Sequence, residues 1–329
     1  MADYKEIVGT RVKAVSANPD NPKVGQVWFN STDEALKYKK AVGGGVWSSG
    51  GNLNTGRTRG GHIGIQTAAL YVAGTLAPGP GRIDNVESYN GSSWTEVADV
   101  PTNRTLVEAA GTQTAGVAFG GEPRTGDTQT WDGSSWTEVN NMNTGRENHG
   151  SCGETQTNAL AFGGSADPSA TSVGICESWN GTSWTEVADF NSVKESSGGS
   201  GTNTAALSFG GGVEPNEPAG IESVESFNGT SWTEVADLNT PGTHVDGAGT
   251  QTAALLMGRF HPSSPNWPIT EAWNGSSWSE VGDLSTGRYF NTGGGTQSAG
   301  LLAGGQAGPG GTNKQDTEEF STIFQITPE

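Results

Sequence analysis

The sequence predicts an all-β fold in which six repeats close into a β-propeller with a short N-terminal arm; a seven-bladed ring is the alternative. Three observations support this prediction. The phrase Asn90–Val97 recurs with little change, and its tryptophan falls at Trp94, Trp136, Trp184, Trp232 and Trp278, with a weaker copy at Trp47. Successive tryptophans are 47, 42, 48, 48 and 46 residues apart, a spacing typical of repeat architectures. Glycine contributes 52 of 329 residues and charged residues only 16%, which fits short strands joined by many turns.

The N-terminal region differs from the rest. Residues 1–25 carry no repeat, and the stretch Ser16–Lys23 contains two prolines and reads as a linker. We therefore predict an attachment arm over 1–25 and a propeller over 26–329. Within the propeller, residues 26–56 are expected to form a three-stranded meander that helps to close the ring, with a turn at Gly43–Gly45 before the strand of Trp47.

Turn signals divide each repeat into four strands. The first is rich in glycine (Gly60–Gly64), the second ends in Gly-Gly (Ala115–Gly121), the third carries a glutamate (Val86–Tyr89), and an Asn-Gly turn leads to the fourth at the tryptophan. One such sheet cannot bury both of its faces, so neighbouring repeats must pack on one another. Small side chains suit the crowded axis, and the tryptophans are expected in the core farther out. The predicted core tryptophans are Trp47, Trp94, Trp136, Trp184, Trp232 and Trp278.

A basic residue opens each repeat and gives a count of six. These residues are Arg57, Arg104, Arg146, Lys194, the Gly242-Thr243 position, where the basic residue is missing, and Arg288. The last repeat has no tryptophan of its own. Either Phe324 replaces it or Trp47 closes that blade, and closure by Trp47 is preferred because it removes an open sheet edge. Trp47 is then expected beside the strands around residues 300–320.

The order of basic residue, strand ending in Gly-Gly, Glu-x-aromatic and tryptophan resembles the kelch repeat of kelch and galactose-oxidase-like β-propellers, over roughly residues 47–329. The Gly-Gly doublet is replaced by Ala73-Gly74 in the first repeat and by Gly258-Arg259 in the fifth. We expect these two strands to bend differently from the others.

A second resemblance concerns the N-terminal segment. Val24–Thr32, with Leu36–Tyr38 and Val46-Trp47 after it, resembles a short strand module of tail-fibre and other virion proteins of tailed bacteriophages, especially marine ones. Near-identical kelch-like repeats also occur in predicted structural proteins of such phages. The resemblance implies a virion protein that is made in the host cytoplasm.

The expected function is therefore a non-enzymatic structural, decoration or tail-fibre-type adhesion protein of a phage particle. Its arm would dock on other virion proteins, in multiple copies per particle, and its loops would contact a host surface glycan or protein. One alternative is a cellular kelch-type protein-interaction scaffold, and another is a carbohydrate-active enzyme.

Charge and hydropathy narrow the choice of partners. The net charge of −18 disfavours nucleic acid and anionic membranes as partners, because both attract basic surfaces. No run of 18 apolar residues is present, and Met1–Glu6 lacks a signal-peptide pattern. We expect no membrane insertion and no export by the usual route.

The histidines and cysteines do not predict a metal site, a cofactor or a catalytic residue. His149 and His244 fall in one column, seven residues before Gln156 and Gln251, but that column also holds Arg59, Leu106, Ser196 and Phe290. Such a mixture is not a ring of metal ligands. Cys152 and Cys176 fall on non-adjacent strands of one blade, too far apart for a disulfide, and are expected to be unpaired thiols.

Two series of glutamates have structural explanations. Those of the fourth strand occupy equivalent positions and are expected to be solvated, whereas a catalytic pair needs two different environments; they are Glu96, Glu138, Glu186, Glu234 and Glu280. Those of the third strand are expected to pair with the basic residue that opens a repeat; they include Glu87, Glu177, Glu225 and Glu271.

Asparagines in glycosylation-type triplets precede the fourth strand, at Asn90, Asn180, Asn228 and Asn274. We interpret them as two-residue Asn-Gly hairpin turns.

Loops of unequal length join the second and third strands, namely Leu76–Arg82, Ser165–Pro168, Val213–Pro218 and Phe260–Pro268. Such loops are where a regular scaffold usually binds partners. The loop of the fifth repeat combines stacking surface with polar groups in Arg259, Phe260, His261 and Trp267, as recognition of a sugar or a protein would require. The alternative is a loop that packs on its own blade.

Overall fold

The computed structural model describes residues 13–17, 27–32, 35–76, 81–166, 171–213, 220–263, 267–308 and 311–328. Every regular element in this part of the chain is a β-strand. Contacts divide the chain into a large unit, Val46–Ser321, and a small unit, Met1–Gly45 with Thr322–Glu329. The predicted boundary between an arm over 1–25 and a propeller over 26–329 stays a prediction, because most of residues 1–25 lie outside the described residues.

Four-stranded antiparallel sheets make up most of the large unit, and each follows the order of the chain. The first sheet is β4 (Gly61–Ile65), β5 (Ala68–Leu76), β6 (Gly81–Tyr89) and β7 (Trp94–Val97). The second is β8 (Glu108–Thr112), β9 (Ala115–Phe119), β10 (Thr128–Trp131) and β11 (Trp136–Val139). The third is β13 (Gly150–Thr155), β14 (Asn158–Phe162), β17 (Cys176–Trp179) and β18 (Trp184–Val187). The fourth is β19 (Gly198–Thr202), β20 (Ala205–Phe209), β21 (Val224–Phe227) and β22 (Trp232–Glu234). The fifth is β23 (Asp246–Thr250), β24 (Ala253–Met257), β25 (Glu271–Trp273) and β26 (Trp278–Glu280). A short ribbon accompanies the third sheet, formed by β12 (Arg146–Glu147), β15 (Ser165–Ala166) and β16 (Thr171–Ser172).

The last sheet combines strands from both ends of the large unit. Within the large unit, its order is β27 (Thr292–Thr296), β28 (Ala299–Ala303), β29 (Thr317–Pro328) and then β3 (Ala35–Ser49). In β3, the Trp47 ring packs on Phe320 with centroids 5.3 Å apart. Its indole N–H donates to Thr270 Oγ1 at 3.0 Å. Trp47 therefore lies beside the strands around residues 300–320, which is the position expected if its strand completes the last sheet.

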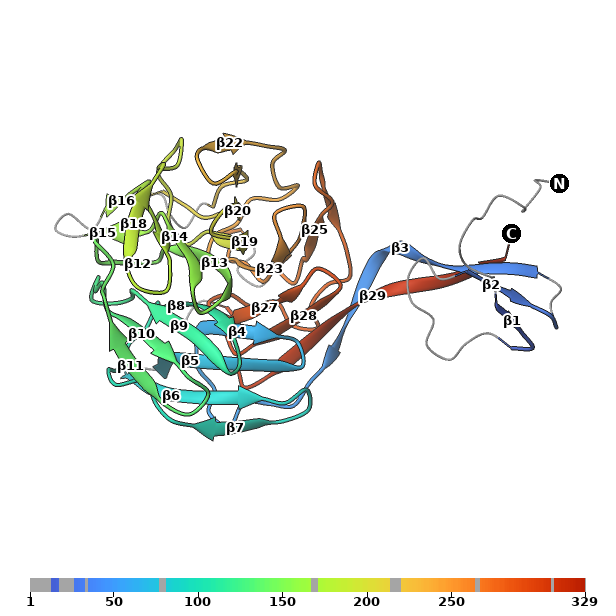
Figure 1. Ribbon diagram of the computed structural model, residues 1–329, viewed down its shortest axis with the longest axis horizontal. Coiled ribbons are helices and arrows are strands. Elements are labelled where there is room, and N and C mark those ends of the chain that lie inside the picture. The colour runs from blue at the N-terminus through green and yellow to red at the C-terminus, as the bar shows by residue number, and fades with distance from the viewer. Residues whose placement is uncertain are drawn as a thin grey trace. The chain divides into compact units, whose positions relative to one another are not determined.

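The first strands of the sheets line the centre of the large unit (Figure 1). β4, β8, β13, β19, β23 and β27 contact one another in this order, and β27 contacts β4, so the contacts form a closed cycle. Neighbouring strands approach closely: a Cβ added at Gly199 would lie 2.2 Å from the Ser151 carbonyl oxygen. This close approach explains why the first strand of each repeat is rich in glycine.

The repeated tryptophans fill the spaces between sheets. Trp94, Trp184, Trp232 and Trp278 are each 5% exposed. Trp184 packs on Phe119 of the preceding sheet with ring centroids 4.8 Å apart, and Trp278 packs on Phe209 in the same way at 5.2 Å. Burial of one such ring is worth at most about 4–6 kcal/mol. Of the six tryptophans predicted as core, Trp47 and Trp136 are only half-buried.

An amide side chain before the second strand joins each sheet to the one before it, a role that sequence reasoning missed. Gln113 Nε2 donates to the Tyr89 carbonyl at 2.6 Å, and Gln156 Nε2 donates to the Trp131 carbonyl at 2.7 Å. The Gln66 amide donates to the Phe320 carbonyl at 2.8 Å and so joins the first sheet to the last.

Two predicted turn geometries are corrected. Tyr89 pairs with Trp94, so the turn between them has four residues rather than two. Its first residue, Asn90, accepts hydrogen bonds at Oδ1 from the backbone N–H groups of Ser92 and Ser93, at 3.0 and 2.9 Å. At the Gly-Gly position, Ala73 has φ 58° and Gly258 has φ 65°, close to the 67° of Gly120. The first and fifth repeats therefore begin this bend as the others do, and Arg259 alone departs from the positive φ of the second residue.

In the small unit, β1 (Lys13–Val15) pairs in parallel with β2 (Val27–Asn30), and β2 pairs antiparallel with β3. β3 runs without interruption from Ala35 to Ser49, so Gly43–Gly45 forms no turn and the expected three-stranded meander is not formed. Residues 1–12 and 18–26, which hold most of the predicted arm, lie outside the described residues. Among the described residues there is no helix of the length and apolarity needed to cross a membrane.

Candidate functional site

The basic residue that opens a repeat is buried against the glutamate of the third strand, as the sequence predicted. Arg57 lies 2.6 Å from Glu87, and Arg146 lies 2.9 Å from Glu177. The remaining pairs of this kind are Lys194–Glu225 at 3.6 Å, Arg259–Glu271 at 2.9 Å, and Arg288–Glu318. In the second repeat, Arg104 donates instead to Gln129 Oε1 at 2.6 Å.

Four of these carboxylates accept hydrogen bonds from the protein at both oxygens, whereas Glu225 does so only at Oε2 and its Oε1 has no hydrogen-bond partner among the described residues. Glu177 also accepts hydrogen bonds from the Asn143 backbone N–H at 2.7 Å and from the Asn143 amide at 2.8 Å. A buried ion pair is tolerated when additional hydrogen bonds satisfy its charges, as they do at Glu177. The pairs are therefore a repeated structural frame rather than a site for a ligand.

Arg259, predicted as a binding residue, belongs to this frame. It is 0% exposed, and its guanidinium donates to Glu271 Oε1 at 2.9 Å. A Cβ added at Gly242 would lie 2.9 Å from Arg259 Cδ. Arg259 thus reaches from the end of β24 into the place of the basic residue that the fifth repeat lacks, and its guanidinium is not available to a ligand.

The other three predicted binding residues are half-buried. His261 and Trp267 stack on each other with centroids 4.7 Å apart and an interplanar angle of 7°. Phe260 packs on Tyr289 with centroids 4.9 Å apart. The described part of this loop therefore packs largely on itself and on its neighbours; residues 264–266 lie outside the described residues.

Six residues with left-handed backbone precede the inner strands, one in each repeat. We call them the mouth ring: Arg59, Leu106, Asn148, Ser196, His244 and Phe290, with φ between 51° and 61°. Backbone hydrogen bonds join neighbours around the ring. Arg59 N–H donates to the Phe290 carbonyl at 2.9 Å, and Leu106 N–H donates to the Arg59 carbonyl at 2.8 Å. The unusual conformation is thus set by closure of the ring.

The structure of the third repeat shows that the sequence alignment of His149 with His244 was wrong. The pairing of β13 with β14 is irregular between Cys152 and Thr155, which adds a residue to the strand. Asn148 therefore takes the column position, and His149 takes the next one, where it is 2% exposed. The two histidines that the sequence aligned do not occupy equivalent places.

Side chains of the mouth ring contact one another on one side. The Arg59 guanidinium lies 3.9 Å from the centre of the Phe290 ring, and the rings of His244 and Phe290 have centroids 3.9 Å apart. His244, Phe290 and Arg59 are half-buried, so parts of these groups remain open to solvent.

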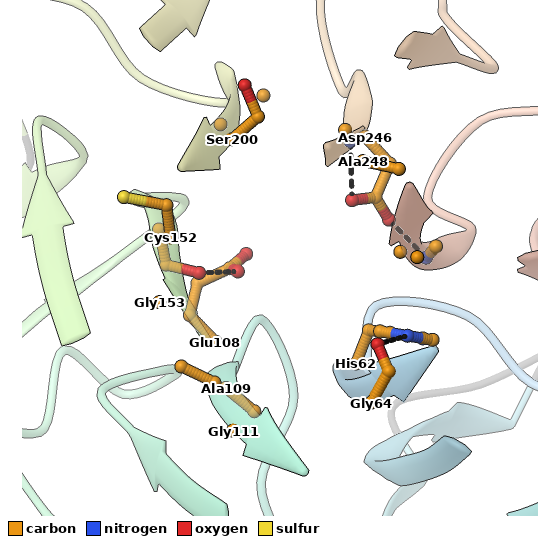
Figure 2. A pocket seen from close by; sticks show the side chains of 18 of the residues that line it. His62, Gly64, Glu108, Ala109, Gly111, Cys152, Gly153, Ser200, Asp246 and Ala248 are labelled. Atoms are coloured by element: carbon orange, nitrogen blue, oxygen red, sulfur yellow. Dashed lines mark hydrogen bonds between the residues drawn. The ribbon is translucent and has the colours of Figure 1, made fainter. Parts of the chain in front are cut away.

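The mouth ring borders a cavity of about 530 Å³ that the inner strands line; we call it the axial cavity. Glu108 of β8 and Asp246 of β23 project into it from facing walls (Figure 2). Glu108 accepts a hydrogen bond from Ser151 Oγ at 2.8 Å. Asp246 accepts hydrogen bonds from the backbone N–H groups of Gly247 and Gly293, at 2.9 and 2.6 Å.

Burial alters the ionisation of these groups. It raises the pKa of Glu108 to about 8, with a further contribution from the charge of Asp246. It also raises the pKa of Asp246 to about 7. Burial lowers the pKa of His62 to about 4 and that of His149 to about 3. Near neutral pH, burial therefore keeps the imidazoles of His62 and His149 uncharged and favours the protonated form of the two carboxyl groups.

The two cysteines are buried, unpaired thiols, as predicted. Cys152 lines the axial cavity, and burial raises the pKa of both thiols. In the described ranges, no group of three or more His, Cys, Asp or Glu side chains is placed to hold a metal ion.

Sequence reasoning did not single out Glu108 or Asp246. The available signal was a carboxylate in the first strand of a repeat, where the other repeats carry Gly61, Gly150, Gly198 and Thr292. A charge in the strand nearest the axis must face either a neighbouring strand or the central space.

Comparison with known proteins bears on the fold alone. No family model matches the chain. No curated protein matches it. Among 430 similar chains of solved structures, that of YjhT aligns with a TM-score of 0.67 and 13% identity, covering 84% of this chain and 99% of that chain. The shared fold is an all-β arrangement of four-stranded antiparallel sheets of the β-propeller type.

Proposed function

We propose that the protein is a six-bladed kelch-like propeller that serves as a non-enzymatic structural or adhesion component of a bacteriophage particle. The six blades would be the five sheets that follow chain order and a sixth made from β27, β28, β29 and β3. The phage assignment rests on the repeats and the N-terminal segment of the sequence, whose resemblance is to virion proteins.

One observation carries the proposal of an adhesion role: a repeated frame supports a mouth ring whose side chains differ in every repeat. The ion pairs and backbone recur, whereas the ring presents arginine, leucine, asparagine, serine, histidine and phenylalanine. Variation on a constant frame suits recognition of a partner better than catalysis.

The strain in the mouth ring supports the same conclusion. A left-handed conformation costs roughly 1–2 kcal/mol for most residues and little for glycine. Glycine would therefore satisfy the backbone at Phe290 or Leu106 with less strain. The presence of bulky side chains at these strained positions therefore indicates that the side chains themselves have a role, such as contact with a partner.

The chemistry of the half-buried groups suits a glycan or a protein surface. The Arg59–Phe290–His244 stack lies next to Phe260 and Tyr289, with the His244 and Phe260 ring centroids 6.3 Å apart. Aromatic faces bind apolar sugar faces, and the adjacent polar groups supply orientation. In this proposal residues 1–25 dock on other virion proteins, and several copies per particle raise the avidity for the host.

The test uses purified particles and the full chain. Antibodies against the chain are expected to label particles. Particles produced with a chain that lacks residues 1–25 are expected to show no label, because that chain would not be incorporated. Purified full chain should bind host cells, and Phe290→Gly should weaken that binding about tenfold or more.

The glycine variant is chosen because it relieves backbone strain and is therefore expected to fold. Circular dichroism would verify that it is folded, so that weaker binding is not attributed to unfolding. Unlabelled particles would exclude the virion role. Normal labelling after deletion of 1–25 would exclude docking by the arm, and undiminished cell binding by Phe290→Gly would exclude recognition by the mouth ring.

A further inference from the structure

One face of the sheet in the small unit is apolar at every paired position. Strand pairing places Ala14 of β1 and Leu36 of β3 beside Phe29 of β2, and Tyr38 of β3 beside Val27 of β2. Residues that pair directly share a face of the sheet, and so do alternate residues of one strand. We call these five positions, which span three neighbouring strands, the apolar face (Figure 1).

The apolar face is open to solvent where its side chains are described. Val27 and Phe29 are 41% and 37% exposed, and Ala14 is also exposed. Trp28 and Asn30, which alternate with them along β2 and so lie on the other face, are only 1% and 3% exposed. A single exposed apolar side chain is ordinary, whereas an exposed apolar surface that spans several strands marks an interaction site.

The composition of the apolar face favours a second copy of this chain as the partner. None of its five positions carries a charged residue. Interfaces between identical chains are the most apolar class of protein interface, and contacts between different proteins carry more polar groups. The small unit has only 53 residues, and association is one of the usual ways in which a unit of this size gains stability.

The distribution of charge favours the same partner. The small unit carries seven Lys or Arg and six Asp or Glu residues, so its net charge is +1, and the large unit accounts for −19. Two large units therefore repel each other, whereas two small units approach with little repulsion. Contact between copies is thus favoured at the small unit.

The β2–β3 hairpin carries opposite charges at its two ends. The connection between its strands contains Asp33 and Glu34 in the sequence. At the other end, beyond the pairing of Val27, β3 continues with Lys39 and Lys40. When two apolar faces pack with their strands antiparallel, the acidic end of each copy meets the basic end of the other. Such complementary charges fix the direction of packing.

We propose that the apolar face is a docking surface for a second copy of this chain, and that two small units pack face to face in a twofold dimer with antiparallel strands. Sheets that pack in this way lie about 10 Å apart, with their inner side chains interleaved. Phe29 has an apolar neighbour on both flanking strands and is therefore expected to contribute most. The dimer does not depend on the proposed virion role.

Analytical ultracentrifugation of the full chain, at about 0.15 M salt to screen general repulsion, tests the dimer. The parent is expected to dimerise in the micromolar range. Phe29→Asp should weaken dimerisation about a hundredfold, because it buries an unpaired charge at the centre of the contact. Val193→Asp is the matched control, since Val193 is an exposed apolar residue of the large unit, and it should dimerise as the parent does.

An exchange of charges tests the direction of packing and leaves every apolar side chain in place. Lys39→Glu with Lys40→Glu should weaken dimerisation about tenfold, and the further changes Asp33→Lys and Glu34→Lys should restore it. Circular dichroism checks that each variant is folded. A monomeric parent would overturn the proposal, as would a Phe29→Asp chain that still dimerises or an equal loss in Val193→Asp. Failure of the second pair of changes to restore dimerisation would overturn the antiparallel arrangement.

Discussion

A lysine in the fourth repeat stands where most other repeats have an arginine, and the geometry of its ion pair is poorer. Lys194 Nζ lies 3.6 Å from Glu225 and has no hydrogen-bond partner among the described residues. Arg146, at the equivalent place, donates to Glu177 at 2.9 Å and to the Gly163 carbonyl at 3.3 Å. A guanidinium offers donors in two directions, whereas an ammonium is a compact charge at the end of its stem.

Lys194→Arg is therefore expected to raise the free energy of unfolding by about 1 kcal/mol at pH 7, the usual gain from one hydrogen bond. Burial lowers the pKa of Lys194 from 10.5 to about 8. Between these values the unfolded chain binds more protons, so this lysine makes stability rise with pH from about 8 to 10.5. Arginine should remove that rise, as urea unfolding at pH 7, 8.5 and 10 would measure.

Arg146→Lys is the matched control and should behave in the opposite way. It should be less stable than the parent at pH 7, and its free energy of unfolding should rise with pH above about 8. A Lys194→Arg protein less stable than the parent at pH 7 would show that the pocket is shaped for lysine, and the argument from donor geometry would be wrong.

At the scale of elements, adjacent sheets are joined by the amide side chains as well as by the tryptophans. Gln251 Nε2 donates to the Phe227 carbonyl at 2.5 Å and to Ser226 Oγ at 3.0 Å, both on β21 of the preceding sheet. The next residue, Thr252, occupies the same turn but is exposed. The pair offers a test of the contact between sheets that leaves the turn intact.

Gln251→Ala is expected to lower the free energy of unfolding by about 1–3 kcal/mol, because it leaves the Phe227 carbonyl without its donor. Thr252→Ala should change it by no more than about 0.5 kcal/mol. Chemical unfolding of the two variants measures the difference. Similar small losses in both would mean that water replaces the amide and that the tryptophans alone join the sheets.

The strands and the frame were predictable because they depend on local pattern and on repetition. Glycine-rich strands, the Gly-Gly bend and the glutamate of the third strand recur at fixed spacing, and the pairing of Arg57 with Glu87 follows from their recurrence. The position of Trp47 beside Phe320 could be predicted because an open sheet edge has a physical cost.

The rest depends on departures from the repeat that the spacing does not reveal. Arg259 fills a place left empty 17 residues earlier, at Gly242. An extra residue in β13 moves His149 out of the column in which the sequence aligned it. Glu108 and Asp246 come to line the same cavity only after the ring is closed, because their strands are half-way round the cycle. The candidate site is thus a property of the closed ring and could not be read from any single repeat.

At the scale of the whole molecule, the end of β3 supplies the fourth strand of the last sheet in the large unit. Without it, the edge of β29 would be open. Residues 46–49 of β3 are the part that belongs to the large unit. Beyond them, Gly50 N–H donates to the Thr317 carbonyl at 2.8 Å and Leu53 N–H donates to the Gln315 carbonyl at 2.9 Å. The chain is therefore tied to β29 and to the segment before it over several residues.

Two truncations separate this role from that of the preceding residues. A chain that begins at Gly44 keeps Trp47 and is expected to unfold with nearly the same stability as the large unit of the full chain. A chain that begins at Gly50 loses the Trp47 contact with Phe320 and the hydrogen bond to Thr270. It is expected to be less stable by about 3–5 kcal/mol, the usual loss for removal of a packed aromatic ring. It should also associate through the exposed edge of β29. Thermal unfolding and light scattering distinguish the two, and equal stability of both truncations would mean that the propeller closes without β3.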